Sequence, residues 1–89
     1  MKIKDGFIYR QVAGQHVVIP VGENIADFNG IVNLNETAAF MWLKLQEGSS
    51  QEQLVAALQN EFDVDAQQAL QDVAAFVQDL RELKAIADE

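Results

Sequence analysis

The chain has 89 residues, and its 14 acidic and 6 basic side chains give a formal net charge of −8 at pH 7. A chain of this length has room for one hydrophobic core, so we expect a single domain over residues 1–89. Nucleic acids and anionic membrane surfaces are bound by clustered Lys and Arg, whereas the bases here are scattered, which argues against both partners. The acidity then serves solubility or attracts a basic partner.

The sequence also argues against export and against thiolate chemistry. It has no cysteine, so neither a disulfide nor a Cys-ligated metal is available. The first residues form no signal-peptide apolar region, and no apolar run approaches the roughly 20 residues of a membrane span. We therefore expect a cytoplasmic protein without a membrane anchor.

The first third of the sequence predicts a β-hairpin. Residues 7–13 and 16–21 are rich in aromatic and β-branched side chains, which favour strands. Between them, Gly14 and Gln15 suit a two-residue type II′ turn with glycine first. This register pairs Val12 with Val17 and leaves Arg10 as the one charged residue on the predicted core face. The apolar residues of that face are Ile8, Val12, Val17, Ile19 and Val21.

A polar loop at residues 22–30, a short third strand at 31–34 and three helices complete the prediction. Asn35 suits the N-cap of a helix over residues 36–47, and Gly48 suits its end. The second helix starts after a capping box at Ser49 or Ser50 and runs to about residue 62. Asp65 caps the third. Its apolar stripe has the clearest helical spacing in the chain: Ala66, Ala69, Leu70, Val73, Phe76, Val77, Leu80 and Leu83.

No combination of residues predicts a reaction. His16 is the only histidine and is expected at an exposed strand end, without the partners that a general base or metal ligand needs. Three hydroxyl residues lack a nearby base and are better explained as helix caps: Thr37, Ser49 and Ser50. A loose acidic group lacks the ligand series of a calcium loop: Glu61, Asp63 and Asp65. We therefore expect no enzymatic activity, no metal and no cofactor.

The predicted third strand lacks the residues that usually prevent another strand from pairing with a sheet edge. Residues 31–34 contain no proline, no lysine and no charge, the features with which proteins usually block an edge. The last helix covers this edge, or a peptide joins it as an extra strand, the mode called β-augmentation.

Several motifs follow one another in a characteristic order. The most specific is residues 34–42, Leu-Asn-Glu-Thr-Ala-Ala-Phe-Met-Trp, at the predicted strand-to-helix junction. The others are Val12-Ala13-Gly14, Asn29-Gly30-Ile31, Gly48 followed by Ser50, Phe62-Asp63-Val64, and Asp72-Val73 with Phe76 and Leu80. Over residues 6–83 the chain resembles the PqqD-like proteins, the family of coenzyme PQQ synthesis protein D. Their fold is called the RiPP recognition element where it handles leader peptides of ribosomally made, modified peptides.

The resemblance implies an α+β, winged-helix-like fold, in which a three-stranded antiparallel sheet packs on three α-helices. It implies a non-catalytic chaperone that binds the leader segment of a precursor peptide as a fourth strand and presents it to a modifying enzyme, such as a radical SAM enzyme. The edge would come from Ile31, Val32, Asn33 and Leu34. The facing helix would supply Gln71, Asp72, Val73, Phe76, Val77 and Leu80, with Gln71 and Asp72 at the polar rim.

Two features depart from the family's pattern. The family usually ends its last helix with a glycine before apolar residues, whereas this chain has Lys84-Ala85-Ile86. The strong acidity suits a neutral or basic peptide better than an acidic leader. Two alternatives stay open beside the peptide chaperone: a structural or oligomerising domain, monomer or homodimer, whose third strand pairs with another copy, and a winged-helix DNA binder.

Overall fold

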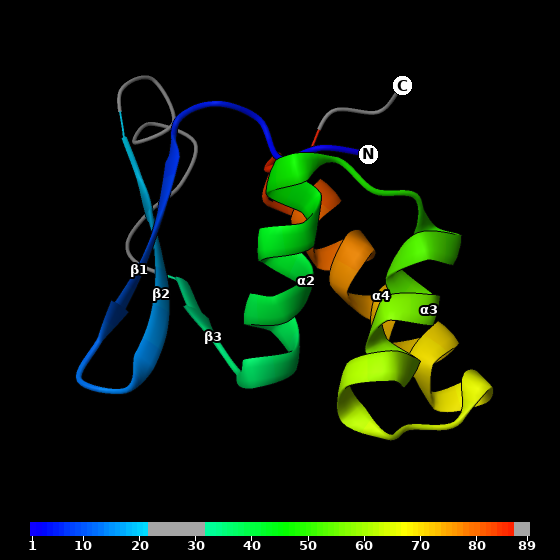
Figure 1. The fold of residues 1–89 in the computed structure, drawn as a ribbon. Helices are drawn as coiled ribbons and strands as arrows, with labels where there is room; N and C mark the ends of the chain where they lie inside the picture. Colours follow the sequence, from blue (N-terminus) through cyan, green and yellow to red (C-terminus); the bar gives the residue numbers. More distant parts are fainter. Residues whose placement is uncertain (22–31, 87–89) are drawn as a thin grey trace.

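The computed structural model describes residues 1–21 and 32–86. In these residues three strands are followed by three helices, whose arrangement can be followed in Figure 1. The elements are β1 (Phe7–Val12), β2 (Gln15–Pro20), β3 (Val32–Leu34), α2 (Glu36–Glu47), α3 (Gln51–Phe62) and α4 (Ala66–Glu82). The sheet is antiparallel with the order β1-β2-β3. The predicted α+β class is thereby confirmed, with its three-stranded sheet and three helices. The predicted loop and Ile31 lie outside the described residues.

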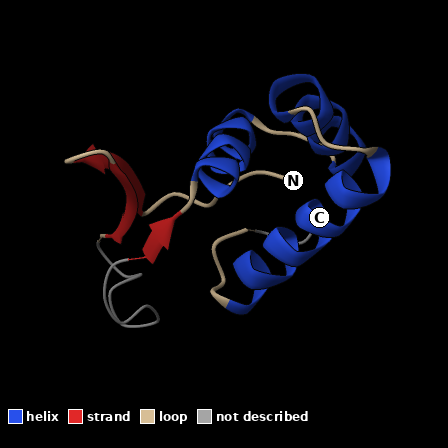
Figure 2. Cartoon of the chain, turned by 90° about the horizontal axis from the view of Figure 1, so that it is seen from below, coloured by secondary structure: helices blue, strands red, loops and turns tan. Residues whose placement is uncertain are grey.

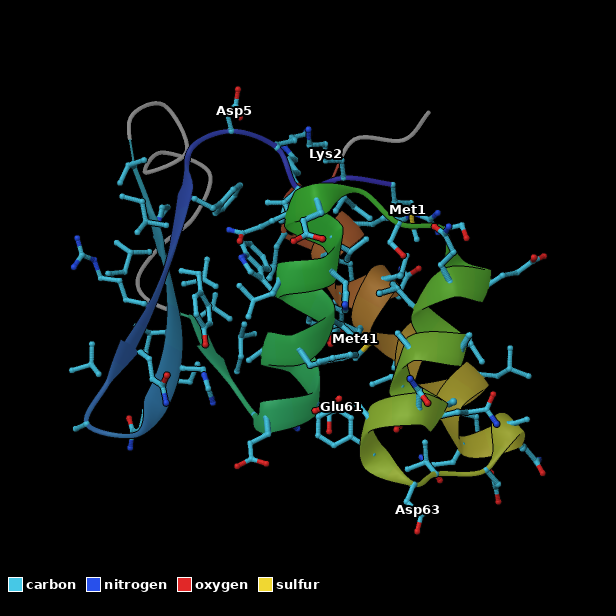
Figure 3. The ribbon with its side chains drawn as sticks, in the orientation of Figure 1. Met1, Lys2, Asp5, Met41, Glu61 and Asp63 are labelled. Atoms are coloured by element: carbon cyan, nitrogen blue, oxygen red, sulfur yellow. The ribbon has the colours of Figure 1, made fainter. Side chains whose placement is uncertain are left out.

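Helix α2 lies between the sheet and α3 (Figures 1 and 2). It therefore has to be apolar on more than one side. Trp42 and Leu45 are fully buried, and Met41 reaches from α2 toward α3 (Figure 3). The other helices complete the core with Leu54, Leu58, Val73 and Val77. Each such side chain contributes about 1.5–3 kcal/mol through removal of its apolar surface from water.

All three helices begin at the predicted caps. Asn35 and Asp65 each accept a hydrogen bond from the backbone N–H three residues later, at 2.8 and 2.7 Å. Of the two serines that fit a capping box, Ser50 forms it: its Oγ accepts from the Gln53 N–H, and Gln53 Oε1 accepts from the Ser50 N–H. Ser49 precedes the cap, so the structure resolves the choice that the sequence leaves open.

The hairpin turn differs from the predicted one by one residue. The two central residues are Ala13 and Gly14, with φ of 52° and 78°, and Val12 pairs with Gln15. Two central residues with positive φ form a type I′ turn, which matches the right-handed twist of the flanking strands. The predicted Gly14-Gln15 turn is wrong because Ala13, a residue that rarely takes positive φ, occupies the first position.

The core face of the hairpin is also the opposite of the predicted one. Val18 on the inner face is 1% exposed, whereas Ile8 and Val12 on the outer face are 40% and 55% exposed. Strand residues alternate between faces, so Phe7 and Tyr9 turn inward together with Val18 and Pro20. The rings of Phe7 and Tyr9 bury more apolar area than the aliphatic side chains of the predicted core face would. This orientation also leaves Arg10 exposed to solvent.

The two ends of the described chain are joined to each other and to α2. Ile3 and Ile86 form an antiparallel bridge, and the Lys4 N–H donates to the Ala85 carbonyl at 2.9 Å. The Ile3 N–H donates to the carbonyl of Leu45, in the last turn of α2, at 3.1 Å. Both isoleucines are buried, so this bridge closes one end of the core.

Helix α4 ends in a turn with a left-handed residue, a position that glycine usually occupies and that Lys84 occupies here. Lys84 has φ of 58°, its N–H donates to the Arg81 carbonyl, and the Ala85 N–H donates to the Leu80 carbonyl. These two bonds form a Schellman motif, whose left-handed residue is most often glycine. The chain therefore builds the expected closing turn without the expected residue, at the cost of a strained backbone at Lys84.

Candidate functional site

A cleft of about 350 Å³ separates β3 from the C-terminal half of α4. It lies at the edge of the sheet, because β3 pairs with β2 on one side and with no described strand on the other. Figure 2 shows the last turns of α4 on the same side of α2 as β3. Its lining residues are Val18, Val32, Asn33, Leu34, Asn35, Ala38, Trp42, Phe76, Asp79, Leu80, Glu82, Leu83 and Ala85.

The floor of the cleft is apolar and rigidly held. Trp42 and Val18 are 2% and 1% exposed, and both belong to the buried core. The ring of Phe7 packs edge-on against the Trp42 indole and fixes it from the sheet side. Since these side chains are held by the core, the floor is preorganised for an apolar side chain.

The sheet side of the cleft is formed by all of β3. The register pairs Val32 with Val18 and Leu34 with His16, so Val32 and Leu34 share a face with the buried Val18. Val32 and Leu34 are half-buried and pack against the core, while Asn33 is exposed. An added strand beside β3 would meet backbone groups along its length and apolar side chains toward the cleft.

Five of the ten predicted site residues line the cleft: Val32, Asn33, Leu34, Phe76 and Leu80. Asp72 lies at a smaller hollow of about 240 Å³ between α2 and α4, which shares Phe76 and Asp79 with the cleft. Val73 and Val77 are buried in the core at 1% exposure, and Gln71 is exposed and outside the cleft lining. Ile31 lies outside the described residues.

Several lining residues were missed by the sequence reasoning. On the sheet and on α2 these are Val18, Ala38 and Trp42, and on α4 they are Asp79 and Glu82. One signal was available: Asp79 follows Phe76 by three residues, which puts the two on neighbouring positions of one helix face.

The helix side of the cleft carries carboxylates. Asp79 lines both hollows and is exposed, and Glu82 lines the cleft near the end of α4. Gln78 Nε2 donates to Glu82 Oε1 at 3.3 Å, and Gln68 Nε2 donates to Asp72 Oδ1 at 2.8 Å. The cleft therefore has an apolar floor and a negative rim.

His16 has a structural partner instead of a catalytic one. It is half-buried, contrary to the expected exposed position, and its Nδ1 shares a hydrogen bond with the Tyr9 hydroxyl. The two rings also stack, with centroids 5.9 Å apart. Among residues 1–21 and 32–86, no three His, Cys, Asp or Glu side chains are grouped to hold a metal ion. The same residues include no helix with the length and hydropathy of a membrane span.

Comparison with known proteins gives one family and two solved structures. The sequence model described as coenzyme PQQ synthesis protein D (PqqD) matches residues 15–86. The fold is similar to TbiB1 in complex with the TbiA(beta) leader peptide, with a TM-score of 0.78 and 23% identity over 99% of this chain and 100% of that one. It is also similar to lasso peptide synthetase B1 complexed with the leader peptide, with a TM-score of 0.77 and 24% identity over 98% and 96% of the two chains.

No curated protein matched this sequence. The family match spans most of the sequence, including β2, β3 and all three helices. The two structural likenesses independently support the winged-helix-like arrangement of sheet and helices. The chain belongs to the coenzyme PQQ synthesis protein D (PqqD) family.

Proposed function

We propose that residues 1–89 act as one peptide-binding unit that captures the leader segment of a ribosomally made precursor peptide. The leader lies along β3 as a fourth strand, with its apolar side chains in the cleft against α4. The observation that carries this proposal is the edge of β3 that pairs with no described strand and lies beside a preformed apolar cleft. Both structurally similar proteins are described as complexes with a leader peptide, which supports the same use of this fold.

The free energy of leader binding depends mainly on the side chains that the cleft buries. Ordering an extended peptide costs roughly 1–2 kcal/mol per residue in backbone entropy. Each backbone hydrogen bond to β3 returns about 0.5–1.5 kcal/mol, so pairing alone roughly cancels the ordering cost. Each apolar side chain buried in the cleft adds about 1.5–3 kcal/mol. Pairing therefore sets the register, and the cleft side chains set the affinity.

We propose that the chain itself catalyses no reaction. The cleft is lined by aliphatic, aromatic, amide and carboxylate groups, and no nucleophile is placed beside a base there. A bound leader would be held for a second protein, so the proposal includes a modifying enzyme, such as a radical SAM enzyme, as the acting partner. No cofactor is assigned to this chain.

The same edge of β3, which pairs with no strand in the described part of the chain, favours one competing role. A second copy could pair its β3 with this β3 and close the cleft, which would make the domain an oligomerisation unit. Sedimentation separates the two roles, because β-augmentation by a peptide predicts a monomer, or a dimer that leaves β3 free. A DNA-binding role is not supported by the cleft, since its charged lining residues are both acidic.

The decisive test is a titration of the ¹⁵N-labelled protein with synthetic leader peptides from genes that neighbour its own. We expect amide shifts at Val32–Leu34 and along the cleft side of α4. Each binding peptide is then N-methylated at successive single positions. Methylation should abolish binding at alternate positions only, because every second residue of an added strand points its N–H toward β3. Uniform tolerance of methylation, or shifts confined to other surfaces, would remove the proposal.

A further inference from the structure

Three carboxylates follow one side of α4 next to the proposed peptide site. Asp79 and Glu82 line the main cleft, and Asp72 lines the adjoining hollow between α2 and α4. With about 1.5 Å of rise per residue, Asp72 lies some 10 Å from Asp79 along the helix, and Glu82 lies some 4–5 Å beyond it. The negative rim thus runs along the cleft for about the length of four or five strand residues.

Asp79 is the group most available to a ligand. It is exposed, it lines both hollows, and within the described part of the chain its carboxylate has no hydrogen-bond or ion-pair partner. Asp72 and Glu82 each accept one bond from a glutamine on the same helix. A carboxylate has about four acceptor sites, so both retain capacity for a further donor.

Among the described residues, the positive side chains nearest in sequence to this rim are Arg81 and Lys84, and neither lines the cleft or the adjoining hollow. The residues that line the two hollows include neither Lys nor Arg. The C-terminal half of α4, which faces β3, adds the negative end of its helix dipole. The N-terminus of α2 reaches the cleft at Asn35 and opposes this field, but Glu36 in its first turn counters it. The charges on the helix side of the cleft therefore favour a cation.

Resting on the proposed function, we infer that this cleft selects leader segments in which apolar anchor residues are flanked by lysine or arginine. The apolar side chains fill the floor, and one cation reaches Asp79 from the side of the added strand that faces α4. A second cation two or four residues away lies on the same face and reaches Asp72 or Glu82. The rim thus distinguishes a basic leader from an acidic one, which the apolar floor alone cannot do.

Each pair between a peptide cation and a carboxylate of α4 is solvent-exposed, so its contribution to the binding affinity is modest and depends on the salt concentration. Replacing two facing cations by neutral side chains is expected to weaken binding about three- to tenfold at low ionic strength. The loss should shrink toward twofold or less near 1 M salt, where the Debye length is about 3 Å. Acidic side chains at the same positions should weaken binding further, because like charges then face each other.

The test uses three twelve-residue peptides with blocked ends and one alternating apolar core. They differ only at two flanking positions, which carry Lys, Gln or Glu. Their dissociation constants are measured by calorimetry for the wild-type protein, Asp79→Asn and Glu47→Gln. The Glu47→Gln control makes the same change of charge at the far end of α2, which is some 16 Å from its cleft end by helix rise.

We expect the order Lys, Gln, Glu in wild type and in Glu47→Gln, with a Lys-to-Gln ratio of at least threefold. Asp79→Asn should reduce this ratio at least twofold while the Gln peptide binds as before. Binding by all three peptides with equal affinity, or an unchanged ratio in Asp79→Asn, would refute the inference and leave the proposed function standing. Failure of all three peptides and of the neighbouring leaders to bind would instead remove the proposed function, and this inference with it.

Discussion

The ring of Phe7 packs edge-on against the indole of Trp42, with centroids 5.9 Å apart and planes inclined by 80°. This contact joins β1 to α2 and so decides which face of the hairpin turns inward. Aromatic pairs in this geometry contribute about 0.5–1.5 kcal/mol beyond the area that they bury. Because Trp42 also forms the floor of the cleft, the hairpin and the candidate site share one support.

Truncation of Phe7 should therefore destabilise the fold far more than truncation of its neighbour. We expect Phe7→Ala to lower the free energy of unfolding by about 2–3 kcal/mol, somewhat less than a fully buried phenylalanine would. Ile8→Ala on the exposed face should cost under about 1 kcal/mol. Urea denaturation measures both values, and equal losses would contradict the inward orientation of Phe7.

The left-handed turn at Lys84 predicts a stabilising substitution. Lys84→Gly should raise the free energy of unfolding by about 0.5–1 kcal/mol, because glycine adopts φ of 58° without the steric cost that a Cβ brings. Lys44→Gly inside α2 removes the same side chain from a regular helix, and it should lower stability by about 1 kcal/mol. Thermal unfolding reports the sign of each change. A loss of stability in Lys84→Gly would speak against the Schellman turn.

The capping box at the start of α3 gives a third prediction. Ser50→Ala removes the acceptor of the Gln53 N–H and should cost about 1 kcal/mol of stability. Ser49→Ala is the matched control, since the Ser49 hydroxyl only donates to the neighbouring carbonyl of Ser50 at 3.2 Å. Its cost should stay within about 0.5 kcal/mol. If both variants lose equal stability, the box is not centred on Ser50.

The cleft itself can be filled from α2. Ala38→Leu adds three carbons to a residue that lines the cleft, and it should weaken leader binding at least tenfold by occupying the place of an anchor side chain. Ala74→Leu makes the same change on α4 at an exposed residue outside the cleft lining, so its affinity should stay within about twofold of wild type. Fluorescence polarisation with a labelled leader measures both. Unimpaired binding by a folded Ala38→Leu protein would move the site elsewhere.

The helices were predictable from the sequence because their signals are local. Asn35, Ser50 and Asp65 bond to backbone within three residues, and such a bond needs no tertiary context. Helix bounds inferred from caps and periodicity accordingly agree with the structure. Two residues that belong to the apolar stripe of α4 by spacing are nevertheless exposed, namely Ala66 and Leu70, and Leu70 is 58% exposed.

The hairpin was harder to predict because its signals are not local. Gly14 is compatible with either of two turns, and the strained Ala13 is accepted only where the rest of the sheet determines it. Both faces of β1 and β2 carry apolar residues, so alternation alone could not choose between them. The choice depends on the contact of Phe7 with Trp42, 35 positions along the chain, which only the folded structure reveals.

The candidate site was predictable in its location and not in its detail. The undefended residues of β3 and the apolar α4 positions Phe76 and Leu80 do meet across one cleft. A helix stripe does not distinguish a residue that lines a cleft from one that fills the core, which is why Val73 and Val77 were grouped with them. Of the acidic rim, the sequence predicts Asp72 but not Asp79 or Glu82, because exposed carboxylates on a helix usually serve only solubility.

The bridge between Ile3 and Ile86 gives the described chain the form of a nearly closed ring. A short glycine linker would suffice to connect the two ends of the chain. Because Ile3 and Ile86 are already held together, closing this linker costs little loop-closure entropy. New termini could then be opened at the exposed Asp63, in the link between α3 and α4 (Figure 3). Such a circular permutant would keep β3 and the cleft unbroken, and it would allow an enzyme to be tethered at the opposite end of the helices.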